Sequence, residues 1–226
     1  MVHVLRKLAG FLPERWQQSM KRIHFARQVR RGAFRSDEPE YQLLDEILSP
    51  GDWVIDIGAN VGHYALKMSE LVKSEGRVLA LEPIPLTFEL LAVNCALSRF
   101  KNCTLLNVAA SNSTGIVKMD VPEWERSKSL NLYEARIVSD SISKHCYGIL
   151  ALRIDTLDIP HRVSFVKIDA EGHELEVLEG MIGLLKRDVP MLVVEGSRAN
   201  HFLESLGYMS QHNSGSPNYI WRCDKR

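Results

Sequence analysis

The eleven residues 54–64 (VIDIGANVGHY) constrain the fold most, because they pass from an apolar stretch through two glycines into a segment with helical periodicity. Gly58 and Gly62 lack a Cβ atom, so the backbone can turn sharply after a strand and approach a ligand closely. Asp56 places a carboxylate at the end of the predicted strand. This pattern predicts a nucleotide-cofactor loop after the first strand of a Rossmann-like α/β sheet.

A second acidic residue supports the same site. Glu82 follows the apolar run 77–81 and lies 20 residues after Gly62, a spacing at which a carboxylate accepts hydrogen bonds from ribose hydroxyls. The residue at position 60 then separates cofactor classes. It is Asn60, so the loop reads DxGxxxG instead of the GxGxxG of nicotinamide and flavin sites. The loop resembles motif I of the class I S-adenosylmethionine-dependent methyltransferases.

Two other interpretations of the loop stay open. A nicotinamide oxidoreductase would share the fold, but Asn60 and the lack of a Tyr-x-x-x-Lys pair argue against it. A glycine-rich turn can also be purely structural, although Glu82 and the surrounding strand and helix periodicities favour a cofactor site.

The remaining periodicities predict one α/β domain whose sheet is mostly parallel and has helices on both faces, and the resemblance to class I methyltransferases implies an antiparallel last strand. Strands are predicted at 53–57, 77–82, 103–108, 163–169 and 189–195, and helices at 41–48, 61–72, from Pro85 onward and along 175–185. Between about 111 and 155 the pattern weakens around Ser127, Ser129 and Ser139, which predicts an inserted hairpin with a polar tip. A short helix at 201–206 and two strands flanking 213–217 complete the domain.

Charge divides the chain into a basic arm and an acidic body. Residues 1–35 contain nine Lys or Arg and one acid, whereas residues 36–226 contain 19 basic and 27 acidic residues. We therefore predict a helical N-terminal arm, 1–35, followed by the α/β domain with the cofactor site, 36–226. The arm also carries Leu8, Phe11 and Trp16. Two interpretations of it stay open: a helix packed on the acidic body, or peripheral contact with an anionic membrane.

Composition argues against several classes of protein. No apolar run approaches the roughly 20 residues of a membrane span, and the stretch 8–12 is followed by Pro13 without a cleavage site, so we expect a cytoplasmic protein. The four scattered cysteines include no CxxC pair, which favours reduced thiols and no zinc site. We expect no nucleic-acid partner, because the body is acidic and the arm lacks an RNA-binding motif. The sequence leaves the oligomeric state open.

A second group of charged residues follows the strand predicted at 163–169. Asp169, Glu171 and Glu174 lie where that strand turns into a helix, and Gly172 allows a tight corner there. Free N–H groups and the helix dipole favour carboxylates at such a place. The acids can therefore cap the helix and pair with Lys167, an interpretation that fits Glu174 best, or they can face a bound ligand.

The segment 167–180 reads KxDxEGxExxVLxG, and with VIDIGANVG, LEP at 81–83 and VVEG at 193–196 it resembles the FkbM family of methyltransferases. The resemblance spans roughly residues 50–220. It implies S-adenosylmethionine as cofactor and O-methylation of a hydroxyl on a small-molecule, saccharide or glycolipid acceptor. A non-catalytic cofactor-binding scaffold and a methyltransferase for a nitrogen acceptor remain as alternatives.

The resemblance also implies residue roles. The residues that would line the methionine and ribose are Asp56, Gly58, Ala59, Asn60 and Gly62. Glu82 would hold the ribose hydroxyls. The adenine would be flanked by Pro83, Val108 and Ala109.

For the general base we rank Asp169 first and Glu171 second, with His173 as a further catalytic candidate and His63 and Glu195 behind it. Asp169 could instead bind the methionine ammonium. No resident metal is expected, although Asp169, Glu171 and Glu195 could together bind Mg²⁺ and acidify the acceptor hydroxyl. The Asp-Asn ligand pair of catechol-type enzymes is missing, since Glu195-Gly196-Ser197 stands there.

Overall fold

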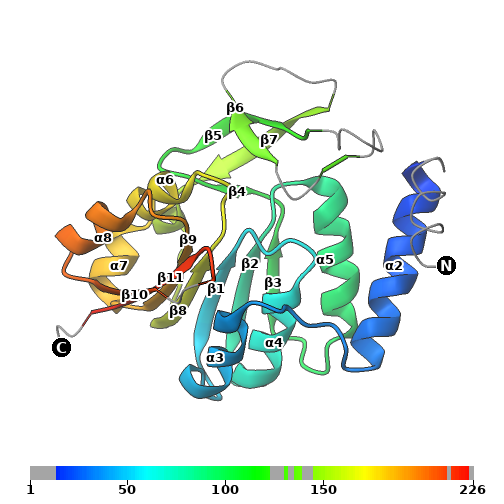
Figure 1. Ribbon diagram of the computed structural model, residues 1–226, viewed down its shortest axis with the longest axis horizontal. Coiled ribbons are helices and arrows are strands. Elements are labelled where there is room, and N and C mark those ends of the chain that lie inside the picture. The colour runs from blue at the N-terminus through cyan, green and yellow to red at the C-terminus, as the bar shows by residue number, and fades with distance from the viewer. Residues whose placement is uncertain (1–13, 123–129, 132–134, 139–144, 213–214, 224–226) are drawn as a thin grey trace.

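A computed structural model describes residues 14–122, 130–131, 135–138, 145–212 and 215–223. Within them, seven strands form a central sheet in the order β10-β11-β9-β8-β1-β2-β3 (Figure 1). The strands are β1 (Trp53–Ile57), β2 (Arg77–Leu81), β3 (Cys103–Leu106), β8 (Val163–Ile168), β9 (Met191–Glu195), β10 (Met209–His212) and β11 (Asn218–Arg222). Those from β9 to β3 pair in parallel, and the last hairpin is antiparallel. The predicted fold class is confirmed.

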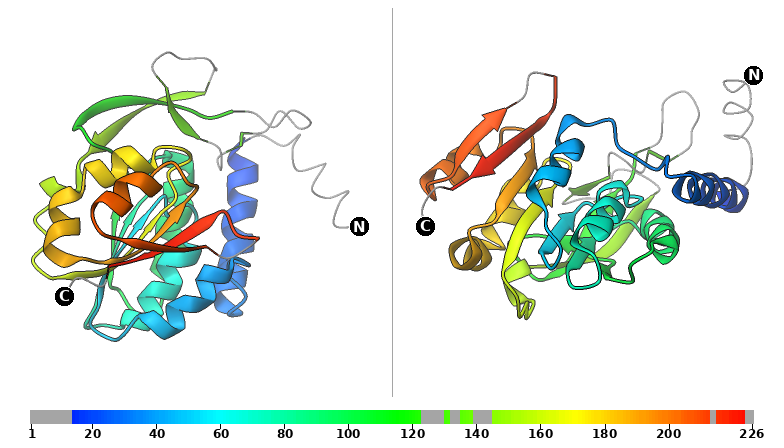
Figure 2. Two further views of the ribbon diagram at one scale, coloured as in Figure 1. Left: turned by 60° about the vertical axis from the view of Figure 1, so that its left-hand side comes forward. Right: turned by 90° about the horizontal axis from the view of Figure 1, so that it is seen from below.

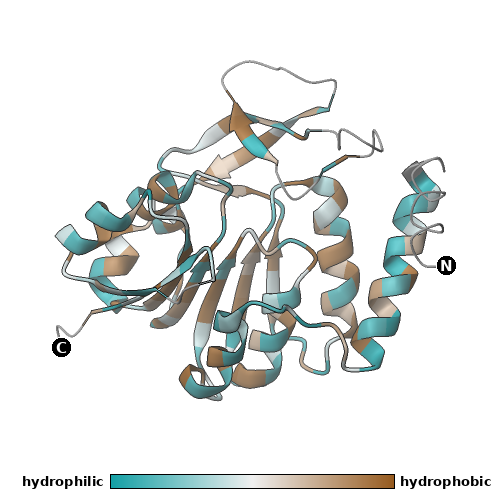
Figure 3. Cartoon of the chain, viewed as in Figure 1, coloured by the Kyte–Doolittle hydropathy of each residue, from teal (hydrophilic) through white to brown (hydrophobic). Residues whose placement is uncertain are grey.

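Alternate residues of β1 show which helices cover each face of the sheet. Ile55 and Ile57 pack in a core cluster with α6 (Glu174–Glu179) and α7 (Ile182–Asp188), whereas Val54 packs in a second cluster with α3 (Pro39–Ile47), α4 (His63–Val72) and α5 (Pro85–Leu97). Period-two alternation of a buried strand places Asp56 on the same side as Val54. The views agree that the helices lie on both faces (Figure 2), and apolar residues dominate the strands between them (Figure 3).

The predicted insertion forms a second sheet above one end of the first. Its strands are β4 (Ala109–Ala110), β5 (Gly115–Asp120), β6 (Arg136–Val138) and β7 (Cys146–Leu152), in the order β4-β7-β5-β6. Met119, Val121 and Ile149 form a small core with Ile84, which lies just before α5. The inserted sheet therefore covers the carboxyl ends of the parallel strands (Figure 1). Ser127, Ser129 and Ser139 lie outside the described residues.

The single helix predicted along 175–185 is wrong, because α6 and α7 are separate helices with Gly180 and Met181 between them. A Cβ on Gly180 would lie 1.9 Å from the backbone oxygen of Ser111, so the chain must approach the inserted segment closely there. The short 3-10 helix η2 (Ile154–Thr156) lies beside the first turn of α7. Its Asp155 accepts hydrogen bonds from the N–H groups of Gly183 and Leu184 at 2.8 and 2.9 Å.

The predicted C-terminal helix and hairpin are present as α8 (Asn200–Ser205), β10 and β11. At the other end of the chain, α2 (Glu14–Arg30) lies alongside α5 (Figure 1). Arg22 of α2 forms an ion pair with Glu89 of α5, and Phe25 packs edge-on against Phe34. None of the helices in the described residues is long and apolar enough to cross a bilayer.

Candidate functional site

A pocket with a cavity of about 260 Å³ opens where β1, β2 and β8 end, beneath the inserted sheet. Ligand sites of open α/β sheets occur at this edge of the sheet. Its lining comes from the loops after these strands, from the segment before α3 and from the inserted sheet, and includes Ser36, Glu38, Asp56, Gly58, Ala59, Asn60, His63, Tyr64, Glu82, Pro83, Ile84, Val108, Ala109, Met119, Ala135, Ile137, Lys167, Asp169, Glu171, His173 and Glu195. All predicted site residues except Gly62 therefore meet around one cavity.

The loop between β1 and α4 needs both of its glycines, for different reasons. Gly58 has φ +74°, and a Cβ there would lie 1.8 Å from the backbone oxygen of Asp169. Gly62 has φ +96°, and a Cβ there would lie 2.8 Å from Cδ1 of Leu91. Gly58 thus lets the β1–α4 loop approach the β8–α6 loop, whereas Gly62 lets α4 pack on α5 and does not line the pocket.

Glu82 ties the cofactor loop to the segment that begins α5. Its Oε2 accepts a hydrogen bond from the Asn60 N–H at 2.9 Å, and its Oε1 accepts one from the Ile84 N–H at 2.9 Å. Burial raises the pKa of Glu82 to about 7, against the lowering effect of these two bonds. Each oxygen keeps a second lone pair for a ligand hydroxyl. Glu82 thus combines a structural role with a position suited to ribose.

Asp56 carries a buried carboxylate that no hydrogen bond of normal geometry satisfies among the described residues. Burial raises its pKa to about 6, and the charge of Lys167 only partly offsets this effect. A buried polar group without a partner costs free energy. Because Asp56 also lines the pocket, its carboxylate is accessible to a ligand bound there.

Lys167 is 3% exposed and connects the acids of the pocket. Its Nζ donates a 2.7 Å hydrogen bond to Oδ2 of Asp169 and lies 4.8 Å from the ring centroid of Tyr64. Burial of Asp169 opposes ionisation, but the charge and hydrogen bond of Lys167 and a hydrogen bond from Glu195 outweigh it, so the pKa of Asp169 is lowered. Burial and the nearby Asp169 charge raise the pKa of Glu195 to about 8. At neutral pH, Glu195 therefore holds the proton and Asp169 is ionised.

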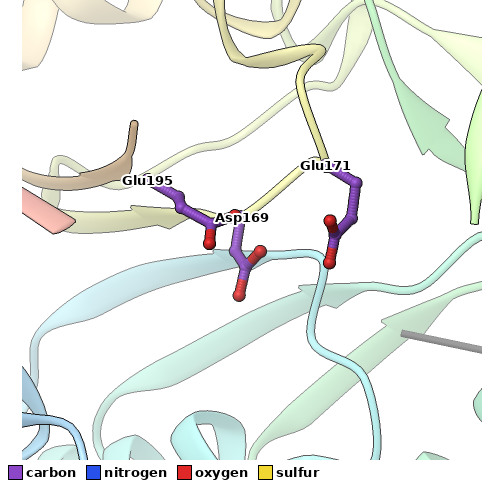
Figure 4. A group of neighbouring side chains, drawn as sticks. All are labelled: Asp169, Glu171 and Glu195. Carbon is purple, nitrogen blue, oxygen red and sulfur yellow. The ribbon is translucent and has the colours of Figure 1, made fainter. Parts of the chain in front are cut away.

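Asp169, Glu171 and Glu195 gather at the same corner (Figure 4). Each offers a carboxylate oxygen, and these atoms lie within 4.8 Å of one another, a spacing at which a cation could bind. Glu171 sits in the left-handed region at φ +50°, which is uncommon for a residue with a Cβ. Because Lys167 and the proton on Glu195 already balance part of the charge, the cluster does not require a divalent ion.

Glu174 binds the backbone of the loop before α6, whereas the sequence predicted that it caps the helix. Its Oε1 accepts hydrogen bonds from the N–H groups of Ala170 and Gly172 at 3.1 and 3.0 Å, and its side chain is buried. The two acids nearer the strand, Asp169 and Glu171, face the pocket instead. Glu174 therefore binds backbone N–H groups of the loop, and Asp169 and Glu171 line the pocket.

The two candidate histidines border the pocket, but each is held by neighbours. Nε2 of His173 lies 3.0 Å from Oγ of Ser111, and its Nδ1 lies 3.5 Å from Oε2 of Glu176. His63 stacks on Phe34 with ring centroids 4.0 Å apart. Burial lowers the pKa of both imidazoles, so both are neutral at physiological pH.

Sequence reasoning missed several pocket residues. Tyr64 directly follows the glycine loop and could have been included on that ground. Glu38 accepts a 2.7 Å hydrogen bond from the Tyr64 hydroxyl, yet nothing in its sequence context indicates a site. Met119 and Ile137 reach the pocket from the inserted sheet, whose pairing the sequence does not reveal. Lys167 was interpreted only as a partner for capping acids.

Comparisons with known proteins relate this chain to methyltransferases. The family model "Methyltransferase FkbM domain" matches residues 56–214. The chain is 26% identical over 194 residues to the hexuronic acid methyltransferase AglP of Haloferax volcanii, which covers 85% of this chain and 73% of that protein. It is 25% identical over 165 residues to the methyltransferase sdnD of Sordaria araneosa, covering 59% and 62% of the two chains.

Among solved structures, the methyltransferase FkbM from Methylobacillus flagellatus superposes with a TM-score of 0.53 at 16% identity, over 91% of this chain and 59% of that one. This likeness shows a shared fold. The chain thus spans less than two thirds of the length of sdnD and of the Methylobacillus protein. The family match covers more than half of the chain, so the protein belongs to the FkbM family of S-adenosylmethionine-dependent methyltransferases, as its motifs predict.

Proposed function

We propose that the protein transfers a methyl group from S-adenosylmethionine to a hydroxyl oxygen of a saccharide or a saccharide-bearing molecule. The observation that carries the proposal is the carboxylate of Asp169, which accepts a hydrogen bond from Lys167 and lines the pocket together with Glu195. The relative that is named a hexuronic acid methyltransferase supports a carbohydrate acceptor. Family membership supports the transfer itself.

We expect S-adenosylmethionine to bind at the end of the pocket that the β1–α4 loop lines, because the side chains there suit its charged and polar groups. The unpartnered carboxylate of Asp56 would accept the methionine ammonium, and Glu82 would accept the ribose hydroxyls. Pro83, Val108 and Ala109 offer apolar surface for the adenine. Bound S-adenosylmethionine supplies an electrophilic methyl group on a positively charged sulfur.

Asp169 is suited to receive the proton of the acceptor hydroxyl. A carboxylate with a lowered pKa is a weak base, but the hydroxyl proton becomes strongly acidic as the oxygen bonds to carbon, so a weak base suffices late in the reaction. Lys167 keeps this carboxylate ionised, and the protonated Glu195 fixes its orientation. In this scheme Asp169 contacts the reacting hydroxyl, whereas Lys167 and Glu195 are positioning residues.

The inserted sheet would close the site over the acceptor. Met119, Ala135 and Ile137 line the pocket from above and present apolar side chains that would exclude water. Positioning two reactants in this way is worth on the order of 7 to 11 kcal/mol of the barrier, more than a single base supplies. Most of the rate enhancement would thus come from alignment of hydroxyl and methyl donor.

Transfer of a labelled methyl group tests the proposal. Purified protein is incubated with [methyl-³H]S-adenosylmethionine and a panel of neutral sugars, uronic acids, amino sugars and glycolipids. The proposal predicts a product that resists alkaline hydrolysis and shows an O-methyl carbon by NMR. A product methylated only on nitrogen would overturn the hydroxyl assignment. Binding of the cofactor without transfer to any member would instead favour the non-catalytic scaffold.

A further inference from the structure

We propose that the outer face of α2 docks this protein on an anionic lipid surface. This face comprises Trp16, Met20 and Ile23 in the first part of the helix and Arg27 and Arg30 near its end. The three apolar side chains are 65%, 48% and 53% exposed, respectively. Spacings of four and three residues place them on one side of the helix. A row of large apolar side chains in water is unusual for a surface that meets only solvent.

The rest of α2 is anchored to the domain, so its outer face has a fixed orientation. Gln18 is buried, and Phe25 and Val29 pack against the cluster that contains α4 and α5. Arg22 pairs with Glu89 of α5. The helix is therefore part of the folded protein, with Trp16, Met20 and Ile23 on its outer side.

The charge of the outer face selects an anionic partner. Arg15, Arg27, Arg30 and Arg31 are all exposed, and from residue 15 to residue 36 the sequence contains no acid. Basic residues beside an anionic bilayer gain Coulomb energy that salt screens. The apolar row and the arginines thus combine the two contributions that hold an interfacial helix on lipid.

The identity of the apolar residues favours lipid over nucleic acid. Tryptophan prefers the interface between headgroups and acyl chains, and methionine and isoleucine gain by burial in the acyl region. Single-stranded nucleic acid would instead be bound by aromatic side chains on which bases stack, and Trp16 alone on this face could do so. Trp16, Met20 and Ile23 therefore point to a bilayer.

The placement of α2 links this face to the pocket. The first residues of α2 lie at the same end of the molecule as the inserted sheet in Figure 1 and in the left-hand view of Figure 2. From the end of α2 the chain passes Phe34, which stacks on His63, and reaches Ser36 and Glu38 at the pocket. If the proposed function holds, docking would bring the pocket close to saccharides carried on lipids.

Sedimentation with sucrose-loaded vesicles tests the docking directly and requires no acceptor. The full chain is mixed with vesicles of phosphatidylcholine alone, or with 30% phosphatidylglycerol, at about 0.1 M salt. We expect binding to the anionic vesicles that weakens at high salt. The triple variant W16S/M20S/I23S should lower the partition coefficient by about tenfold or more. The variant R27Q/R30Q/R31Q should remove the preference for anionic lipid.

A matched control separates this face from general surface hydrophobicity. Ile116, Leu150 and Met209 are 75%, 44% and 55% exposed on the strands β5, β7 and β10. The variant I116S/L150S/M209S should bind vesicles as the unaltered protein does, and every variant should keep its affinity for S-adenosylmethionine as a check of folding. Equal losses in the control and the α2 variants would overturn the proposal.

Two other results would also overturn it. The first is that the unaltered protein does not sediment with anionic vesicles. The second is that the protein does not bind vesicles but uses α2 to self-associate or to bind single-stranded RNA. Ultracentrifugation would detect the self-association and a gel shift the RNA binding, and either would be lost in the α2 variants. Neither result bears on methyl transfer to water-soluble saccharides, so failure of the docking proposal and failure of the proposed function are distinguishable.

Discussion

The Nζ atom of Lys167 donates a 2.7 Å hydrogen bond to Oδ2 of Asp169 in a place where Lys167 is almost fully buried. Lys167 lies on β8, and Asp169 follows the strand two residues later. The alternation of an extended chain therefore places both side chains on the same side. Its positive charge lies among Asp56, Asp169 and Glu195, and thus stabilises a group of acids that burial alone would neutralise.

Replacement of Lys167 by Met should destabilise the protein by about 3–5 kcal/mol at pH 7, because it leaves buried acids without their cation. It should also raise the pKa of Asp169 and shift the acidic limb of the kcat profile to higher pH. Urea unfolding and pH-rate profiles measure the two effects. The control is Lys186→Met on the exposed surface of α7, which should change neither. A Lys167→Met protein with an unshifted acidic limb would contradict the role given to this pair.

Replacement of Glu195 by Gln should change the pH dependence on the alkaline side. In the unaltered protein Glu195 loses its proton near pH 8, and above that pH it no longer donates a hydrogen bond to Asp169. We therefore expect kcat to fall above about pH 8. The amide of the variant remains a donor at every pH, so its alkaline limb should move to higher pH or vanish. An identical limb in both proteins would argue that Glu195 does not position Asp169.

Asp56→Asn should have opposite effects on stability and on cofactor binding. The Asp56 carboxyl has its ordinary pKa near 3.8 when unfolded and about 6 when folded. Between these values the folded state keeps a proton that the unfolded state has lost, so Asp56 lowers stability as pH rises through this window. The ligand-free variant should thus gain up to about 3 kcal/mol relative to the unaltered protein between pH 4 and pH 7.

The same variant should bind S-adenosylmethionine at least tenfold more weakly, because the amide does not attract the methionine ammonium. Chemical unfolding at the two pH values and calorimetry measure the two quantities. Asp158→Asn, on the loop between η2 and β8, is the control and should alter neither. A destabilised Asp56→Asn protein with unchanged affinity would show that Asp56 is a structural residue.

Gly58→Ala tests the close approach of two loops. A Cβ at this position would meet the Asp169 backbone oxygen at 1.8 Å, so we expect a loss of at least about 4 kcal/mol in the free energy of unfolding or failure to fold. Gly51 has φ +94° with nothing within 4 Å of an added Cβ. Gly51→Ala should therefore cost only the strain of its backbone, about 1–2 kcal/mol. Similar unfolding curves for both variants would contradict the contact.

The sequence predicts those parts of the fold that depend on local pattern. Apolar alternation and the loop around Gly58 place the sheet, its cofactor edge and the acids Asp56 and Glu82 correctly in space. The break between α6 and α7 was missed, because it depends on contact of Gly180 with Ser111, far away in the sequence. The family and cofactor are confirmed by the family match, whereas the roles of individual site residues stay predictions.

The environment of an ionisable group also depends on contacts that a sequence does not reveal. Lys167 was expected to pair with helix-capping acids, whereas Glu174 caps the loop and Lys167 faces the pocket. Glu38 accepts a hydrogen bond from Tyr64 in the site, although it belongs to a segment that carries no motif. Asp169 follows β8 and Glu195 ends β9, so the hydrogen bond between their carboxyl groups follows only from the pairing of β8 with β9.

Calorimetric titration of S-adenosylmethionine into the unaltered protein and Glu82→Ala, with and without EDTA, most directly tests whether this pocket is a metal-independent cofactor site. We expect micromolar binding by the unaltered protein that EDTA does not change, and a loss of affinity of about 100-fold or more in Glu82→Ala. Glu204→Ala, on the exposed surface of α8, should bind normally. Three results would contradict a metal-independent cofactor site in this pocket. They are undiminished binding by Glu82→Ala, binding that disappears with EDTA, and no binding by the unaltered protein.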